Sequence, residues 1–176
     1  MSIEIKRNIF QTIVYEIETE FNNLSTLTFV NQTLFDEEKM FTTFHKTKQI
    51  LNEEGFKDLK NHVMNFIDIF TKNVLQKQKF EITDSWIQAY KKNHHHSLHV
   101  HYLEKNYYSL IFYIQCTEES SKTIFFPPGF PYVQSDSIKI IPKKSKFVIF
   151  PGYVPHEVEH NQDDQRIIFS CNFSVF

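Results

Sequence analysis

The sequence predicts a mainly β protein of the α+β class, a double-stranded β-helix (jelly roll) buttressed by N-terminal helices. Three observations predict it. After Lys79 the chain has about eight short runs rich in β-branched and aromatic residues, separated by turn-forming residues. Before Lys79 there is one long segment with helical periodicity. The length of 176 residues suits one domain with a sizeable core. We therefore expect a single domain over residues 1–176, with a supporting part at 1–80 and a β-sandwich carrying the site at 81–176.

The N-terminal part contains one clear helix. Residues 8–20 fit a strand and a helix equally well, because their apolar side chains match both periods. Residues 31–48 are polar and mixed, which favours a loop with short turns. Residues 53–77 carry apolar side chains at three- and four-residue steps, and Asn52 is suited to cap their first turn. We expect the apolar stripe of this helix to pack on a sheet.

The second part of the chain reads as strands. Turn formers such as Pro127 to Gly129 and the Pro151-Gly152 pair separate the apolar runs. The predicted strands are residues 86–90, 97–102, 107–116, 123–126, 137–141, 146–150, 156–160 and 166–173. Such spacing is typical of two packed antiparallel sheets.

Composition narrows the functional classes. The formal net charge of −2 argues against a dedicated nucleic-acid binder, which normally carries a basic patch. Cys116 and Cys171 lie in apolar runs and read as free thiols in a reducing compartment. The first residues have no signal-peptide pattern, and no apolar stretch is long enough to span a membrane. We expect a cytoplasmic protein without membrane association.

Histidines give the strongest functional signal. Five of the nine histidines fall within residues 94–101, which read HHHSLHVH. Residues two apart on a strand point to the same face, so His99 and His101 can reach one ion. His156 follows a Pro-Gly turn and can supply a third ligand. Three protein ligands with open positions suit a catalytic metal, and imidazole suits iron, zinc, copper and nickel. The run from His94 to His96 is expected to be a solvated bystander.

An arginine in an apolar context is the second signal. Arg166 comes ten residues after His156 and opens the last, otherwise apolar strand. An arginine in such a place is costly to bury without a partner. It either reaches solvent at the strand end or clamps a carboxylate, for which its planar fork is suited.

These pieces together resemble the iron(II)- and 2-oxoglutarate-dependent oxygenase superfamily, and most of all the small oxygenases of marine bacteria and phages. The order of the motifs carries the resemblance across nearly the whole chain. They are Asn8 to Tyr15 (NIFQTIVY), Ser85-Trp86, His99-Val100-His101, Ser109 to Tyr113 (SLIFY), Phe150-Pro151 through His156, and Arg166 through Asn172.

The resemblance implies roles for single residues. His99, His101 and His156 would hold Fe(II), and Arg166 would bind the distal carboxylate of the cosubstrate 2-oxoglutarate, with O2 as the second cosubstrate. Tyr90 would place its hydroxyl on the same carboxylate. Tyr113 and Asn172 are further candidates for the cosubstrate pocket. The resemblance also implies a small-molecule or peptidyl substrate, a homodimer, and the host cytoplasm if a phage encodes the chain.

The chain departs from the family pattern, and two alternatives stay open. His101 stands where the superfamily usually has a carboxylate, which makes the site more positive, while Ile168 and Leu110 replace a small hydroxyl residue and a glycine.

A cupin-like metal protein that does not use 2-oxoglutarate would add Glu104 to the three histidines. A binding module without enzymatic activity would instead use the proline-rich loop at residues 125–132.

Overall fold

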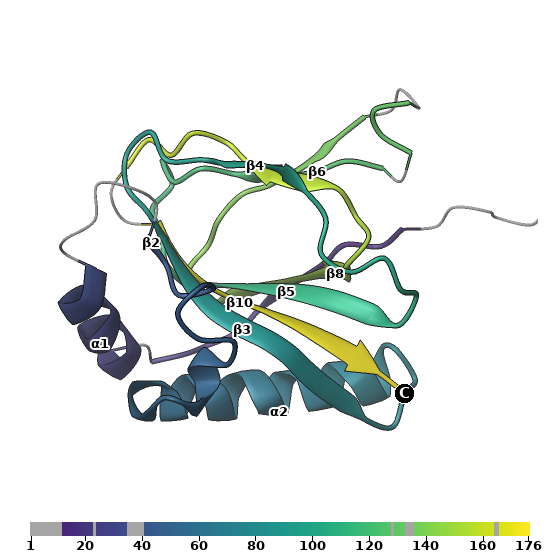
Figure 1. Cartoon of the computed structure of the whole chain (residues 1–176), viewed down its shortest axis with the longest axis horizontal. Coiled ribbons are helices and arrows are strands. Elements are labelled where there is room, and N and C mark those ends of the chain that lie inside the picture. The colour runs from purple at the N-terminus through teal and green to yellow at the C-terminus, as the bar shows by residue number, and fades with distance from the viewer. Residues whose placement is uncertain (1–11, 23, 35–40, 128, 133–135, 164–165) are drawn as a thin grey trace, which may run out of the picture.

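The computed structural model describes residues 12–22, 24–34, 41–127, 129–132, 136–163 and 166–176. Within these residues two antiparallel sheets face each other, with helices on the far side of the larger sheet (Figure 1). The larger sheet has the order β1-β8-β5-β10-β3-β2 and the smaller one the order β4-β9-β6-β7. The strands are β1 (Tyr15–Glu18), β2 (Phe41–Thr42), β3 (Phe80–Tyr90), β4 (His96–His99), β5 (Tyr107–Gln115), β6 (Thr123–Phe125), β7 (Ile138–Ile140), β8 (Lys146–Pro151), β9 (His156–Val158) and β10 (Arg166–Val175).

The predicted jelly-roll strands are confirmed. Each of the eight predicted runs after Lys79 corresponds to one strand from β3 to β10. The largest differences are that β3 begins earlier, at Phe80, and that β4 ends at His99 instead of residue 102. Cross-strand pairing explains the first difference, because the end of β10 pairs with residues as early as Phe80.

The long helix is shorter than predicted. α2 spans Lys57–Asn73, and two 3-10 turns, η1 (Ile50–Asn52) and η2 (Glu54–Phe56), precede it. The expected cap at Asn52 is therefore wrong, and Phe56 occupies the N-cap position. The reason is packing: η1 and η2 bury Ile50, Leu51 and Phe56, and the turns bring these side chains to the core before the helix begins.

Two further segments differ from the prediction. The expected loop at residues 31–48 is wrong at its start, because α1 (Leu24–Leu34) continues into it. β2 then follows after the residues that the structure does not describe. The ambiguous segment at residues 8–20 contains β1, and its first residues lie outside the described ranges.

The two faces of β10 separate the core from the site. Ile167, Phe169, Cys171 and Phe173 belong to the apolar cluster that also holds the buried face of α2. Phe66 of α2 stacks on Phe147 of β8 at 3.9 Å between ring centroids. The alternating residues of β10, beginning with Arg166 and Ile168, point to the space between the sheets. Within the described residues, no helix combines the length and apolar character needed to cross a membrane.

Candidate metal centre

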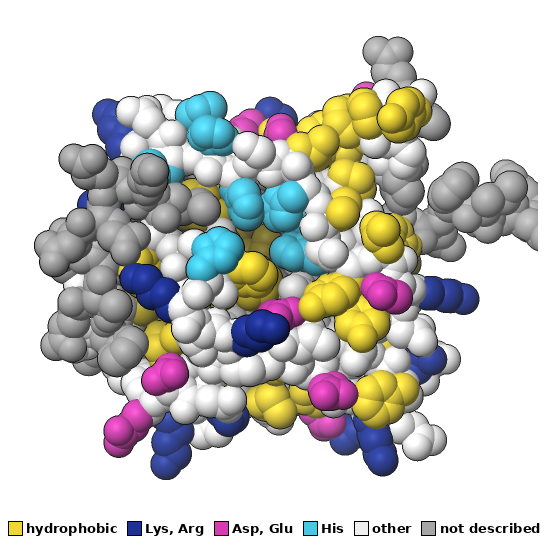
Figure 2. All heavy atoms as spheres, viewed as in Figure 1, with side chains coloured by type: hydrophobic (Ala, Val, Ile, Leu, Met, Phe, Trp, Pro, Cys, Tyr) yellow, Lys and Arg dark blue, Asp and Glu magenta, His cyan; other side chains and the backbone are white. Residues whose placement is uncertain are grey.

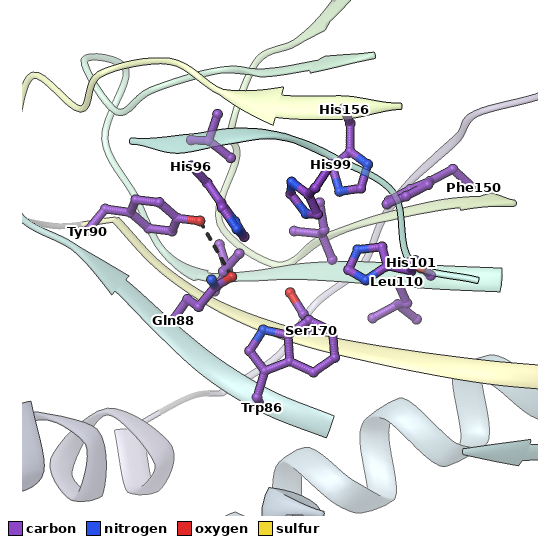
Figure 3. Close-up of a pocket in the computed structure, with 14 residues that line it drawn as sticks. Trp86, Gln88, Tyr90, His96, His99, His101, Leu110, Phe150, His156 and Ser170 are labelled. Carbon is purple, nitrogen blue, oxygen red and sulfur yellow. Dashed lines mark hydrogen bonds between the residues drawn. The ribbon is translucent and has the colours of Figure 1, made fainter. Parts of the chain in front are cut away.

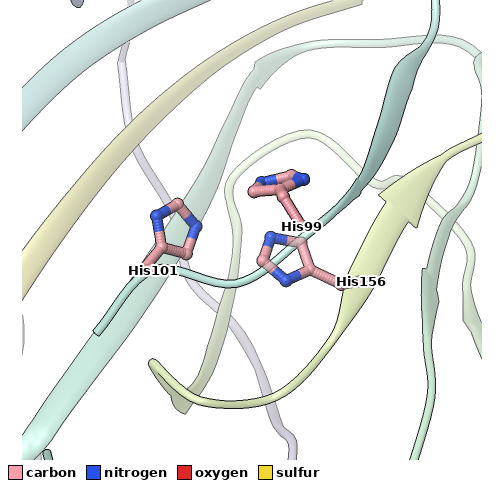
Figure 4. Close-up of side chains that lie close together, drawn as sticks. All are labelled: His99, His101 and His156. Carbon is pink, nitrogen blue, oxygen red and sulfur yellow. The ribbon is translucent and has the colours of Figure 1, made fainter. Parts of the chain in front are cut away.

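Three histidines converge between the two sheets (Figure 4). One ligand atom from each of His99, His101 and His156 lies within 4.8 Å of the other two. His99 is the last residue of β4 and His156 is the first residue of β9, and the two are direct cross-strand partners. Their ring centroids are 4.2 Å apart, while that of His101 lies 5.2 Å from His99 and 5.0 Å from His156.

His101 reaches the group from outside the strand. The sequence predicts one strand for both His99 and His101, but β4 ends at His99 and His101 lies beyond its end. Its backbone N–H donates to the carbonyl of Gly152 over 2.9 Å. A Cβ atom on Gly152 would lie 3.0 Å from the carbonyl oxygen of Tyr102. Glycine at this position therefore allows the segment with His101 to pack against the turn that leads to His156.

Backbone hydrogen bonds leave metal-binding nitrogens free. The Nδ1–H of His99 donates to the carbonyl of Ser97 at 2.8 Å, and that of His156 donates to the carbonyl of Val154 at 3.0 Å. Each bond fixes the ring and directs the unprotonated Nε2 of the neutral tautomer to the centre of the group. Imidazole donors arranged in this way fit Fe(II) and other first-row ions.

Burial keeps these histidines neutral at neutral pH. Desolvation, with a smaller repulsion from His99, lowers the pKa of His101 to about 3. Desolvation also lowers the pKa of His99 and brings the pKa of His156 well below its ordinary value. Neutral rings are the form that binds a metal ion, so no proton needs to be removed before an ion enters.

A fourth histidine belongs to the site. His96 was expected to be a solvated bystander, and this expectation is wrong. Its ring stacks on that of His99 at 4.0 Å, and burial lowers its pKa to about 4. A register irregularity between His96 and His99 explains the error, because it brings residues three apart to one face of β4. By contrast, His95 is exposed and stacks on His160.

The histidines form one wall of a cavity between the sheets (Figure 3). Trp86, which reads as a core residue, is only 5% exposed and also faces this cavity. The residues of the inner cavity include Trp86, Gln88, Tyr90, His96, His99, His101, Ser109, Phe150, His156, Ile168 and Ser170.

Arg166 is fully buried behind this cavity. Its Nε donates to the carbonyl of Ser121 and its Nη2 donates to the Thr123 hydroxyl, both over 3.2 Å. Nη1 is buried and has no hydrogen-bond partner among the described residues. The guanidinium carbon lies 4.3 Å from the ring centroid of Tyr90 and 5.5 Å from that of Tyr113. A buried donor without an acceptor is costly, and a ligand carboxylate would supply that acceptor.

The other sequence candidates occupy different positions. Tyr90 faces the inner cavity, where its hydroxyl donates to Oε1 of Gln88 at 3.5 Å, and burial raises its pKa although Arg166 acts in the opposite direction. Tyr113 and Asn172 do not line the cavity. The Tyr113 hydroxyl contacts the Thr123 hydroxyl at 3.2 Å, and Oδ1 of Asn172 accepts a hydrogen bond from Ser109 at 2.7 Å.

The described residues do not form the cupin ligand set. Glu104 lies in an exposed turn shortly after His101, and its carboxylate is not part of the group that could hold an ion. The ligand set that the structure assembles therefore consists of three histidines.

Comparison with known proteins shows to which family the chain belongs. Residues 84–172, about half of the chain, match the family model described as "Putative 2OG-Fe(II) oxygenase". The chain belongs to this family. The oxygenase is therefore an oxidoreductase, and its family uses iron, 2-oxoglutarate and O2. The matched range contains all seven site residues predicted from the sequence.

Solved structures show the same fold at low sequence identity. The oxygenase matches a viral collagen prolyl hydroxylase from Paramecium bursaria Chlorella virus-1, solved as a 2OG complex, with 13% identity and a TM-score of 0.61 over 93% of this chain and 96% of that chain. A prolyl hydroxylase from Trichoplax adhaerens, solved with a hypoxia-inducible-factor peptide, matches with 13% identity and a TM-score of 0.65 over 93% and 83%. A 2OG-Fe(II) oxygenase family oxidoreductase from Burkholderia pseudomallei matches with 13% identity and a TM-score of 0.54 over 65% of this chain, which spans 55% of that protein. A search of curated proteins finds no match.

Proposed function

We propose that the oxygenase holds Fe(II) with His99, His101 and His156, binds 2-oxoglutarate through Arg166, and oxidises a small-molecule or peptidyl substrate. The observation that carries the proposal is the convergence of three neutral imidazoles on a cavity whose wall residue Tyr90 lies against a buried arginine with one unpaired donor. Bound Fe(II) would supply the activation of O2, for which 2-oxoglutarate provides two electrons.

The chain's own residues orient the reactants. The fixed Nε2 atoms of His99 and His156 select the position of the ion, since their Nδ1 atoms are bound to the backbone. Three neutral ligands leave the full charge of a divalent ion in place, which favours a dianionic cosubstrate beside it.

Arg166, behind the inner cavity, selects a carboxylate in this proposal. Nη1 of Arg166 is the free donor, and we assign to the Tyr90 hydroxyl a second contact with the same carboxylate. In this proposal Tyr113 and Asn172 do not contact the carboxylate but act through other side chains. Tyr113 supports Arg166 through the shared Thr123 hydroxyl, and Asn172 holds Ser109 at the cavity wall.

Further proposals concern organisation and context. Residues 1–176 would form one domain, and structural matches that cover 93% of the chain support this. The division into a supporting part at 1–80 and a sandwich over 81–176 stays a prediction. A cytoplasmic location is supported by the two free cysteines, Cys116 and Cys171. The expected homodimer and the host cytoplasm of a phage-encoded chain stay predictions.

Turnover of the cosubstrate tests the proposed function. The purified protein, loaded with Fe(II) and given 2-oxoglutarate and O2 without a further substrate, is expected to form succinate slowly. The His99→Ala variant is expected to form none, whereas His160→Ala, an exposed histidine outside the triad, should match the wild type. The proposal fails if the wild type forms no succinate and shows no affinity for 2-oxoglutarate.

A further inference from the structure

A second, larger cavity opens beside the histidines. Its volume is about 320 Å³, and it shares Trp86, Gln88, His96, His99 and His101 with the inner cavity. We call it the outer cavity. Histidine side chains surround this hollow on the molecular surface, and hydrophobic side chains form its floor (Figure 2). The residues of the outer cavity are Thr42, Phe44, His45, Trp86, Gln88, His96, His99, Val100 and His101.

An aromatic wall comes from the N-terminal part of the chain. Phe44 is 45% exposed and lies edge-on to Trp86, with 5.1 Å between ring centroids. The pairing of β2 with β3 holds it there, because the backbone N–H of Thr43 donates to the carbonyl of Ile87 and the Thr43 hydroxyl accepts from the N–H of Ile87. Phe44 lies outside residues 84–172, so the family's matched region does not supply this wall.

The described lining of the outer cavity carries no aspartate, glutamate, lysine or arginine. The amine of nearby Lys46 lies over the ring of Phe41, 4.8 Å from its centroid. Thr42 and Gln88 offer neutral hydrogen-bonding groups instead. A cationic substrate group placed here would lose water without gaining an acidic partner, whereas an apolar ring would gain contact with Phe44 and Trp86.

We propose that the outer cavity binds the prime substrate through an uncharged aromatic group, held against Phe44 and Trp86 next to the metal centre. This inference rests on the proposed function for the reaction itself, but the binding of the group does not depend on metal or cosubstrate. The same chemistry can come from a free aromatic molecule or from an aromatic side chain of a peptide.

Trp86 makes the binding directly measurable. It is the single tryptophan of the chain and lines the cavity, so its selectively excited fluorescence reports on the occupant. The metal-free protein would be titrated with benzyl alcohol, N-acetylphenylalaninamide and N-acetyllysinamide. We expect a saturable change with the two aromatic probes and at least about tenfold weaker binding of the lysine probe. Tighter binding of benzyl alcohol indicates a free small molecule, and tighter binding of the phenylalanine probe indicates a peptide.

Two variants, each replacing one aromatic side chain by alanine, complete the test. Phe44→Ala should weaken the aromatic probes by about tenfold, since one face-to-edge contact is lost. Tyr132→Ala removes an aromatic ring that is 95% exposed and does not line the cavity, and it should leave binding unchanged. Zn(II) affinity, measured by calorimetry, should equal that of the wild type in both variants. Equal binding of all three probes, or no response to the aromatic ones, overturns the inference, whereas failure of the wild type to bind Zn(II) counts against the proposed metal centre.

Discussion

The backbone N–H of His101 lies 2.9 Å from the carbonyl oxygen of Gly152 and donates a hydrogen bond to it. This bond connects the segment after β4, which carries His101, to the turn that leads into β9 and His156. The spacing of the triad therefore depends on a main-chain contact as well as on the three side chains.

Gly152→Ala is expected to weaken metal binding. The new Cβ would lie 3.0–3.1 Å from the backbone of Tyr102, so Tyr102 must move by a few tenths of an ångström, and His101 moves with it. We expect Zn(II) affinity, measured by calorimetry, to fall by about 10–100-fold, as when an outer-shell partner of a ligand is lost. Gly55→Ala, in the turn η2 away from the site, serves as control. An unchanged affinity in Gly152→Ala would show that the contact does not position His101.

Removal of one triad histidine should abolish stoichiometric metal binding. His99→Ala leaves two imidazoles, which hold a divalent ion too weakly to survive dialysis. The matched control is the double variant His95→Ala/His160→Ala, because these two rings also stack but lie outside the triad. Metal content per chain, measured by elemental analysis, should be near zero for the first variant and unchanged for the second. Equal metal content in both would assign the ion to another site.

The metal-free protein should lose stability in mild acid. The pKa values of His96 and His101 fall from the ordinary 6.5 to about 4 and about 3 in the fold, so the unfolded chain takes up protons first. The contribution of these two neutral histidines to the free energy of unfolding is therefore fully present above pH 6.5. It decreases as the pH falls toward 4 and 3. Melting temperatures between about pH 7 and 5 test this, because carboxylates contribute little in that window. His96→Gln should reduce the dependence of the melting temperature on pH, whereas substitution of the exposed His160 (His160→Gln) should not. An equal pH dependence in the wild type and both variants would contradict the assignment.

The helix-covered face of the larger sheet should dominate stability. Phe147 is fully buried; its ring stacks on that of Phe66 at 3.9 Å and meets that of Phe112 at a tilt, with 4.3 Å between centroids. Phe147→Ala is expected to lower the free energy of unfolding by about 3–5 kcal/mol, measured by urea titration. Val74→Ala, at a helix end where the side chain is 46% exposed, should change it by less than about 0.5 kcal/mol. Similar losses from the two variants would mean that α2 does not pack as described.

Local patterns predict the strands and the triad, whereas tertiary pairing decides the rest of the site. The eight strand predictions succeed because apolar alternation and turn residues are local signals. His96 could not be assigned from sequence, since its direction depends on the irregular pairing of β4 with β9. Phe44 gives no signal at all, because β2 has two residues and reaches the site only by pairing with β3. The last turn of α1 is missed because residues 31–33 are polar.

The central claim is that Arg166 and the metal centre together bind one five-carbon diacid. The most direct measurement is a titration of the anaerobic, Fe(II)-loaded wild type with 2-oxoglutarate and with 2-oxobutyrate, which keeps the keto acid but lacks the distal carboxylate. Charge-transfer absorption and calorimetry report the affinity. We predict saturable binding of 2-oxoglutarate that requires Fe(II), and binding of 2-oxobutyrate weaker by at least about tenfold, since the buried Nη1 is then left unpaired. Equal affinities for the two acids, or no binding of 2-oxoglutarate to the loaded protein, would contradict the account.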